Sequence, residues 1–401
     1  MKLRWVNGGV TAARGFRASG VHAGIKRGRK PDLSLVAADA PAVAVGVFTK
    51  NLVQAAPVLL SKARLGTPQA RAILINSGCA NCLTGEAGVR DAMTMSRAVA
   101  RALQVSEREV LVASTGLIGR RLPVARIARA VPVLIRQLNR RHHEAAAQAI
   151  LTTDLHPKEA AVEALMQGRP CRLGGMAKGA GMIAPSMATM LGVITTDAAI
   201  APGLLRRLLQ AATERTFNRI SVDGDMSTND TVFALASGRA GVAIQPGSRA
   251  EALFTGMLEA VAERLAMLLV KDGEGAAKLM EIEVVGARTA RDAQACARQV
   301  ACSPLVKTML AGGDPNVGRI AAAVGAAPIR LYPQQLEIHV EGVRLVARGA
   351  ALAVSPSVLR QLLTRPTVHV RIHLHAGQAR GRMLTCDLTE EYVRINAGYA
   401  T

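Results

Sequence analysis

The 401-residue sequence is poor in aromatic residues, with one Trp, three Tyr and five Phe. Proteins that bind single-stranded nucleic acid stack bases on aromatic side chains, so this scarcity counts against that function. Acidic residues are also few, with 29 Asp and Glu against 50 Lys and Arg, which gives a formal net charge of +21. Such an excess is typical of proteins that bind nucleic acid or membrane surfaces.

The distribution of the positive charge weakens that interpretation. Residues 1–30 contain eight basic and no acidic residues, whereas residues 151–300 contain sixteen of each. The dense run Lys26-Arg27-Gly28-Arg29-Lys30 is interpreted as a solvated basic surface, with a polyanion site as the alternative. We therefore expect no nucleic-acid partner.

Cysteines and long uncharged runs are scarce as well. Six cysteines in 401 residues do not make a disulfide framework, which favours a reducing, cytoplasmic location. Cys79 and Cys82 have the spacing of a metal or redox pair, but zinc needs two further ligands and no second pair follows nearby, so we expect no metal. The longest uncharged stretch, residues 179–196, contains Pro185 and three glycines, which suits no membrane span. A soluble protein without a membrane partner is expected.

Short apolar runs alternate with helical patterns along most of the chain. Apolar residues at spacings of three and four predict helices over 124–138, 204–212 and 250–270, and Ser355-Pro356 starts another. Short apolar or alternating runs predict strands, among them one whose polar face carries His369, His373 and His375. The strand ranges are 43–48, 71–76, 110–113, 193–196, 281–285, 336–340 and 368–374. The prediction is an α/β fold with mixed β-sheets and a smaller C-terminal α/β lobe from about residue 280 to 401.

Several motifs of common enzymes are missing. No Gly-x-Gly-x-x-Gly follows a strand, and neither a phosphate-binding Gly-Lys-Ser/Thr loop nor a Gly-x-Ser-x-Gly elbow is present. The sequence contains instead a series of loops dense in Gly, Asn, Thr and Asp. These are residues 76–78, 114–119, 152–154, 178–191, 218–225, 272–275, 312–316 and 395–396.

The loop at residues 178–191, KGAGMIAPSMATML, places Thr189 between a Gly- and Pro-rich segment and a predicted strand. Self-cleavage needs this arrangement, because the Thr hydroxyl attacks the preceding carbonyl and water releases a new N-terminal Thr. The α-amine of such a Thr has an unperturbed pKa of roughly 7.7–8.0, so much of it is free base near neutral pH. One residue then supplies both the nucleophile and the base.

This run resembles the self-cleavage signature of the ornithine acetyltransferases (glutamate N-acetyltransferases) of cyclic arginine biosynthesis. Six further blocks resemble that family in the same order and span nearly the whole chain. They are STGLIG (114–119), TTDLHPK (152–158), FNRISVDGDMSTNDT (217–231), KDGEGA (271–276), SPLVKTMLAGGDPNVGRI (303–320) and YVRINAGYAT (392–401). The resemblance implies the mixed-sheet fold of these self-cleaving enzymes.

The resemblance also implies roles for individual residues. Cleavage between Ala188 and Thr189 would give an α chain of residues 1–188 and a β chain of residues 189–401, two of each in the assembly. Thr189 would carry the acetyl group, and the Thr115 hydroxyl with the Gly116 N–H, in a turn after the strand 110–113, would form the oxyanion hole. The substrate contacts would be Lys178, either Thr152 or Thr153, Thr189, Glu274, Asn396 and Thr401.

The sequence departs from the family pattern at a few places. Ala180 and Ser186 replace Ser and Asn of the cleavage block, and Gly398 and Ala400 replace Asp and Arg near the C-terminus. The block NSGCANCLTG contains unusual cysteines, and the GGDPN block lacks bulkier residues. Gly398 and Ala400 lie between the implied substrate contacts Asn396 and Thr401. Substrate affinity is therefore the property that we expect these changes to affect most.

The implied activity is transfer of an acetyl group from N-acetylornithine to glutamate by a ping-pong route on Thr189, with no tightly bound cofactor. Acetyl-CoA as a second acetyl donor, which would make the enzyme bifunctional, is left open. One alternative is an N-terminal-nucleophile aminopeptidase or amidohydrolase of related fold, in which water replaces glutamate. A second is a basic binding protein without catalytic activity, which would bind polyanions in a steeply salt-dependent way.

Overall fold

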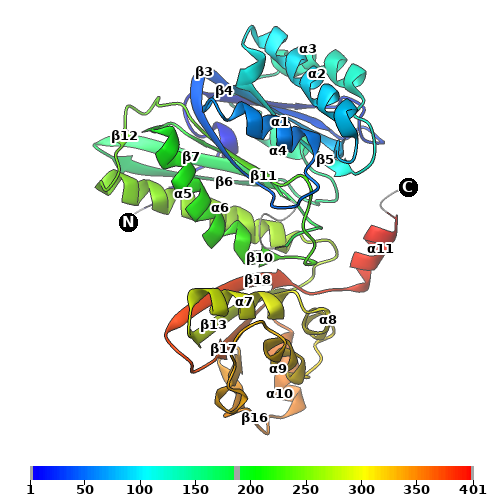
Figure 1. The fold of residues 1–401 in the computed structure, drawn as a ribbon, viewed down its shortest axis with the longest axis vertical. Helices are drawn as coiled ribbons and strands as arrows, with labels where there is room; N and C mark the ends of the chain where they lie inside the picture. The colour runs from blue at the N-terminus through cyan, green and yellow to red at the C-terminus, as the bar shows by residue number, and fades with distance from the viewer. Residues whose placement is uncertain (1–2, 185–189, 399–401) are drawn as a thin grey trace. The chain divides into compact units, whose positions relative to one another are not determined.

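The computed structural model describes residues 3–184 and 190–398. The chain divides into two compact units (Figure 1). Unit one consists of residues 1–179, 186–218 and 226–269, and unit two of residues 180–185, 219–225 and 270–401.

Unit one is built on a nine-stranded mixed sheet. Its strand order is β1-β6-β7-β8-β11-β3-β4-β5, with β2 paired to β3. The pairs β4–β5 and β8–β11 are parallel, and the other pairs are antiparallel. The strands are β1 (Arg4–Trp5), β2 (Phe16–Val21), β3 (Leu33–Phe48), β4 (Gln69–Cys79), β5 (Val110–Leu117), β6 (Lys158–Met166), β7 (Arg169–Lys178), β8 (Leu191–Thr196) and β11 (Thr231–Ala236).

Alternation along the central strands explains how helices cover this sheet on both faces. In β3, Leu33 and Leu35 pack with residues of α2 and α3, whereas Val36 and Ala38 pack on the opposite side with residues of α4. The α-helices of the unit are α1 (Ala56–Arg64), α2 (Gly85–Leu103), α3 (Val124–Arg136), α4 (His143–Ala149), α5 (Pro202–Arg215) and α6 (Arg249–Lys271). The unit also contains the short helices η1 (Gly9–Thr11) and η2 (Glu107–Glu109) and the first two residues of η3 (Phe217–Arg219). A small second sheet is formed by β9 (Ala199–Ile200) and β12 (Ala243–Ile244).

Unit two contains a seven-stranded sheet with its own core. The strand order is β10-β18-β13-β17-β14-β15-β16. Its strands are β10 (Ile220–Ser221), β13 (Leu279–Ala287), β14 (Glu337–Val340), β15 (Val343–Ala347), β16 (Ala350–Ala351), β17 (Thr367–His373) and β18 (Ala379–Cys386). Its helices are α7 (Ala290–Ala301), α8 (Pro304–Gly312), α9 (Gly318–Gly325), α10 (Pro356–Leu363), α11 (Glu390–Gly398) and η4 (Pro333–Gln335).

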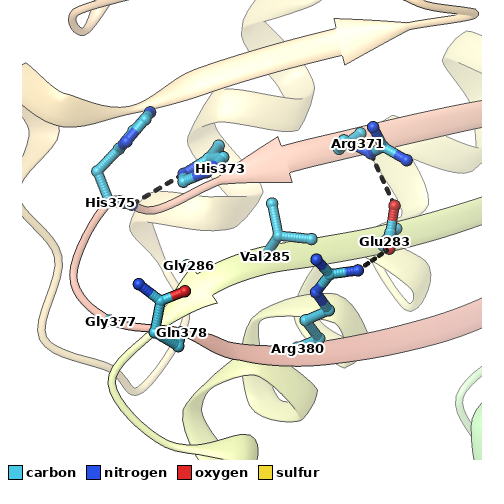
Figure 2. Close-up of a pocket in the computed structure, with 9 residues that line it drawn as sticks. All are labelled: Glu283, Val285, Gly286, Arg371, His373, His375, Gly377, Gln378 and Arg380. Atoms are coloured by element: carbon cyan, nitrogen blue, oxygen red, sulfur yellow. Dashed lines mark hydrogen bonds and ion pairs between the residues drawn. The ribbon is translucent and has the colours of Figure 1, made fainter.

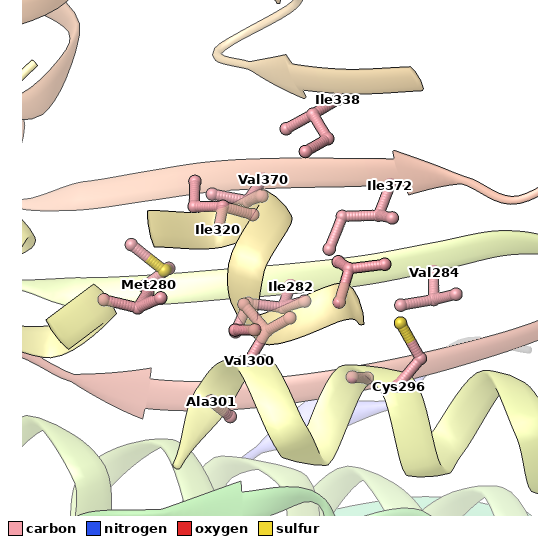
Figure 3. Close-up of a cluster of buried hydrophobic side chains, with 14 of the residues drawn as sticks. Met280, Ile282, Val284, Cys296, Val300, Ala301, Ile320, Ile338, Val370 and Ile372 are labelled. Carbon is pink, nitrogen blue, oxygen red and sulfur yellow. The ribbon is translucent and has the colours of Figure 1, made fainter. Parts of the chain in front are cut away.

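The core of unit two lies on one face of its sheet. Ile282 in β13 and Ile372 in β17 pack against Cys296 and Val300 of α7 and against Ile320 of α9 (Figure 3). The residues that alternate with the buried ones along each strand, such as Glu283 in β13 and Arg371 in β17, point to the other face of the sheet. This period-2 pattern is the one that identified both strands in the sequence.

The predicted α/β class with mixed sheets is confirmed, and each predicted strand and helix overlaps an observed one. Several strands are longer than predicted, β3 by the most. β3 begins at Leu33, ten residues before its predicted start, because a shift in its register against β4 between Ala37 and Ala42 lets the strand continue through Pro41. No helix in the described part of the chain has both the length and the apolar composition needed to cross a bilayer.

Candidate active site

Three of the predicted site residues meet at the ammonium group of Lys178, the last residue of β7. Its Nζ donates to Thr152 Oγ1 at 2.7 Å and to Thr115 Oγ1 at 3.3 Å. Only 3% of the Lys178 side chain is exposed. Thr153 lies in the same turn, and no side-chain hydrogen bond of it is found among the described residues. Of the two threonines left open by the sequence, Thr152 is therefore the one that contacts Lys178.

A buried carboxylate lies between two lysines at this point. Asp154 accepts from Lys158 Nζ at 2.7 Å and lies 3.6 Å from Lys178 Nζ. It also accepts from the Gly179 and Thr152 amides, at 2.7 and 3.1 Å. Burial by itself raises the pKa of Asp154, but the charges of Lys178 and Lys158 and the donated hydrogen bonds outweigh it and hold the pKa well below its usual range. Asp154 is thus a fixed anion between two cations.

Thr115 and Gly116 lie inside β5, not in a turn after it, so the prediction of a turn was wrong. The strand runs to Leu117 because Ser114, Thr115 and Gly116 pair with residues 76–78 of β4. Gly116 has a φ of +126°, and a Cβ there would lie 2.3 Å from the carbonyl carbon of Gly78. Only glycine fits this close approach of two strands.

Buried amide side chains hold the backbone next to Thr115. Asn229 Nδ2 donates to the carbonyl of Ser114 at 2.8 Å and to that of Ala80 at 2.7 Å. Ser114 Oγ donates to Asn76 Oδ1 at 2.5 Å. Because the Ser114 carbonyl and the Thr115 N–H share one peptide plane, these bonds fix the orientation of Thr115.

The contacts of Thr115 determine what its hydroxyl can do chemically. Since Lys178 donates to Thr115 Oγ1, the hydroxyl acts as acceptor toward the ammonium and keeps its own proton for another acceptor. A donor that is itself polarised by a cation is a strong one, because hydrogen bonds in a chain reinforce each other. The arrangement suits stabilisation of a developing negative oxygen.

Lys26 also belongs to the surroundings of this cluster, which corrects its assignment to a solvated basic surface. Its Nζ donates to the carbonyl of Leu151 at 3.1 Å, whereas Arg27 to Lys30 are exposed. Burial lowers the pKa of Lys26 to about 8, and the charges of Lys30 and Lys178 act in the same direction, while Asp32 opposes them.

Unit two brings together Glu274 and Asn396, which are far apart in the sequence. Asn396 Nδ2, on α11, donates to Glu274 Oε2 at 2.7 Å. The Glu274 amide donates to the carbonyl of Ala180 at 2.8 Å. A Cβ on Gly181 would lie 2.3 Å from Glu274 Oε2, so glycine lets the chain pass close to this carboxylate.

The segment that precedes the predicted cleavage point is also anchored within unit two. Asp223 accepts from the Met182 amide at 2.5 Å and from the Ile183 amide at 2.9 Å. The Ile183 carbonyl accepts from the amides of Val222 and Gly224 and from the hydroxyl of Ser221. Met182 has a φ of +55°, a strained value for a side chain of this kind.

The predicted residues Ala188, Thr189 and Thr401 lie outside the described residues, as does Ala400. Met190, directly after Thr189, is described. Its amide donates to Asp230 Oδ1 at 3.0 Å, and its carbonyl accepts from the amide of Thr231.

Neither the cysteine pair nor a surface hollow provides another site for the predicted chemistry. Cys79 and Cys82 are buried and bond to different carbonyls, and no metal-ligand cluster occurs among the residues that the structure describes. A hollow in unit two is lined by none of the predicted site residues (Figure 2). Its lining consists of Glu283, Val285, Gly286, Arg371, His373, His375, Gly377, Gln378 and Arg380.

Comparison with a family model decides the relationship: residues 17–401 match the model of the ArgJ family. The chain belongs to the ArgJ family. The arginine biosynthesis bifunctional protein ArgJ of Thermosynechococcus vestitus is 45% identical, over 99% of both chains. The chloroplastic ArgJ of Citrullus lanatus is 44% identical, over 99% of this chain and 89% of its own.

The chain is also similar in sequence to a solved ornithine acetyltransferase. The ornithine acetyltransferase of Mycobacterium tuberculosis, solved in complex with ornithine, is 43% identical over 46% of this chain and 99% of that chain, with a TM-score of 0.44. The ArgJ family match confirms the expectation, drawn from the sequence blocks, that the chain is an enzyme of the ornithine acetyltransferase family.

Sequence reasoning assigned no role to several buried polar residues of this ArgJ family member. Asp154, Lys158, Asn229 and Asp230 are all less than a tenth exposed. Each lies inside a block that was already noted, TTDLHPK or FNRISVDGDMSTNDT. The sequence signal that could have identified them was the presence of polar residues in short loops next to apolar strands. Polar side chains at such places are often buried, and a buried polar group needs a hydrogen-bond partner.

Proposed function

We propose that this ArgJ family member transfers the acetyl group of N-acetylornithine to glutamate, giving ornithine and N-acetylglutamate, with Thr189 as the acetyl carrier. The observation that carries this proposal is the Lys178–Thr115 contact, in which an ammonium polarises a hydroxyl next to Gly116. Lys178 precedes Thr189 by eleven residues in the sequence. The names of the relatives, arginine biosynthesis bifunctional proteins, support the same pathway.

In the first half-reaction, the Thr189 hydroxyl attacks the acetyl carbonyl while its own α-amine accepts the proton. The Thr115 hydroxyl and the Gly116 N–H donate to the tetrahedral oxyanion. The C–N bond then breaks, the proton moves from the amine to the leaving nitrogen, and ornithine departs. In the second half-reaction, the amine of glutamate attacks the acetyl ester of Thr189 and the steps run in reverse.

Charge complementarity supports the choice of amino-acid substrates. The Lys158, Asp154 and Lys178 trio contains two cations and one anion, and a group with this net positive charge suits a substrate carboxylate. Thr152 would contact the same substrate. Glu274, oriented by Asn396, would bind the side-chain ammonium of ornithine, and Thr401 would complete the contacts.

The enzyme is proposed to mature by self-cleavage at Ala188–Thr189, into an α chain of residues 1–188 and a β chain of residues 189–401, two of each. The bonds that Asp223 and the Val222–Gly224 backbone make to residues 182–183 support this. They anchor the chain a few residues before the scissile bond, and the left-handed backbone at Met182 shows strain next to that anchor.

The activity is tested by incubating the purified protein with N-acetylornithine and glutamate. We expect ornithine and N-acetylglutamate in equal amounts. Free acetate in place of N-acetylglutamate would identify a hydrolase, and neither product would refute the proposed function. A parallel reaction of acetyl-CoA with glutamate shows whether the enzyme also uses that donor.

Replacing Thr115 with Ala removes one of the two proposed oxyanion donors. We expect kcat to fall on the order of 10²–10³-fold, since loss of such a donor has this effect in other enzymes. KM should change far less, because the donor acts mainly once negative charge develops. Steady-state kinetics provide the measurement, with Thr94→Ala, an exposed helical hydroxyl, as the control. Unchanged kcat in Thr115→Ala would remove Thr115 from the mechanism.

A further inference from the structure

Asp230 and Met190 lie at the starts of two neighbouring parallel strands. Met190 precedes β8 and Asp230 precedes β11, and the two strands pair from Leu191 and Thr231 onward. The amide of Met190 donates to Asp230 Oδ1 at 3.0 Å, and the amide of Thr231 donates to the Met190 carbonyl at 3.1 Å. The carbonyl of Asp230 accepts from Thr49, which ties the same residue to the end of β3. Asp230 is held rigidly and is only 1% exposed.

One oxygen of this buried carboxyl group has a clear partner and the other does not. Oδ2 of Asp230 makes no hydrogen bond within the described residues. Burial raises the pKa of Asp230 well above its usual value; the Met190 amide, the Ser227 hydroxyl and the charge of Lys178 oppose this without cancelling it. Burial thus disfavours the ionised form of Asp230, and Oδ1 accepts from the Met190 amide in either form.

The Met190 amide has a special place in the proposed reaction. The peptide plane that contains this N–H also contains the carbonyl and the Cα of Thr189. After cleavage, that peptide bond is the only covalent link of Thr189 to the protein. Whatever fixes the Met190 N–H therefore fixes the plane from which the nucleophile and its amine extend.

We propose that Asp230 is a positioning residue for Thr189, holding the Met190 amide through Oδ1 so that the N-terminal nucleophile keeps one orientation. This inference rests on the proposed role of Thr189. Asp230 acts through the backbone and takes no part in proton transfer to the substrate.

The test compares two variants of the full-length protein. Asp230→Asn keeps a side-chain oxygen acceptor in a group of the same shape, so we expect self-cleavage to proceed and kcat to stay within about threefold of wild type, with an unchanged pH profile. Asp230→Ala removes the acceptor; we expect kcat to fall on the order of 10²-fold, the usual effect of a misplaced reacting group, and KM to change less than threefold. Thr213→Val, which removes a buried hydroxyl of unit one that makes no hydrogen bond to any described residue, is the control and should keep full activity.

Two outcomes would overturn the inference. One is an Asp230→Ala enzyme with kcat within twofold of wild type. The other is an Asp230→Asn enzyme as impaired as the Ala variant or with a shifted pH profile, which would mean that Asp230 works as a charged group. Asp230→Asn decides the question even if Asp230→Ala does not fold. If Thr189→Ala is active, the proposed function itself is wrong; if Thr189→Ala is inactive and the Asp230 variants behave like wild type, only the positioning role fails.

Discussion

The Thr189→Ala protein is expected to remain one uncut chain of 42.0 kDa without acetyltransferase activity. The hydroxyl that the substitution removes is needed twice, first for the acyl shift that cleaves the Ala188–Thr189 bond and then for the acetyl ester. Both functions should therefore fail together, while stability changes little because the lost group is small. Intact-mass analysis of the purified variant, beside the two-substrate assay, measures both.

Thr189→Ser is the matched variant, since it keeps the hydroxyl. We expect it to cleave more slowly, because Ser lacks the methyl group that restricts χ1 and therefore positions the attacking oxygen less well. The wild-type protein is incubated with N-acetylornithine in the absence of glutamate, and the reaction is then quenched. Mass spectrometry should find an acetyl group on the N-terminal peptide of the β chain. An intact, fully active wild-type chain, or acetyl on another residue, would refute the assignment to Thr189.

Replacing Asp154 with Asn is expected to lower the free energy of unfolding by about 3–5 kcal/mol, the usual cost of removing one partner of a buried ion pair. The substitution removes the carboxylate that contacts both Lys158 and Lys178, whose side chains are 1% and 3% exposed. The new amide also places a donor toward the Gly179 and Thr152 N–H groups or toward an ammonium. Asp154 is therefore far more costly to change than a surface carboxylate.

Urea unfolding of the variant and of Asp39→Asn measures this difference. Asp39 pairs with Arg17 in an exposed bridge, whose loss should cost only about 0–1 kcal/mol. Equal effects of the two substitutions would contradict a structural role for the buried trio.

The lowered pKa of Asp154 predicts that the protein loses stability as the pH falls. Because the pKa of Asp154 is lower in the folded protein than in the unfolded chain, its contribution is complete above about pH 4, the unfolded pKa. Stability should fall as the pH drops below that value, because the unfolded chain then binds the proton that the folded protein excludes. The Asp154→Asn variant should lose stability less steeply between about pH 4 and 2. A variant as acid-sensitive as the wild type would assign the acid loss to other carboxylates.

The sequence by itself determined the α/β class, the family and the positions of seven strands and four helices, fewer than half of those observed. Alternation in strands and spacing of three and four in helices are local signals, which is why the strands that contain Ile282 and Ile372 could be predicted before the helices that cover them were known. The cleavage block also needed no structure, because a Gly- and Pro-rich loop before a Thr is readable in one stretch of chain.

Tertiary structure alone decided which polar residues meet. Thr115, Thr152 and Lys178 come from separate segments of the chain. Only strand pairing and the turn before β6 bring the two threonine hydroxyls to the ammonium group of Lys178. Strand pairing likewise extended β5 through Thr115, since backbone partners on β4, not side-chain propensity, maintain a strand. Asp154 and Asp230 resemble ordinary loop aspartates in the sequence. Their burial and their opposite pKa shifts, lowered by two lysines in Asp154 and raised by burial in Asp230, arise from distant segments that surround them.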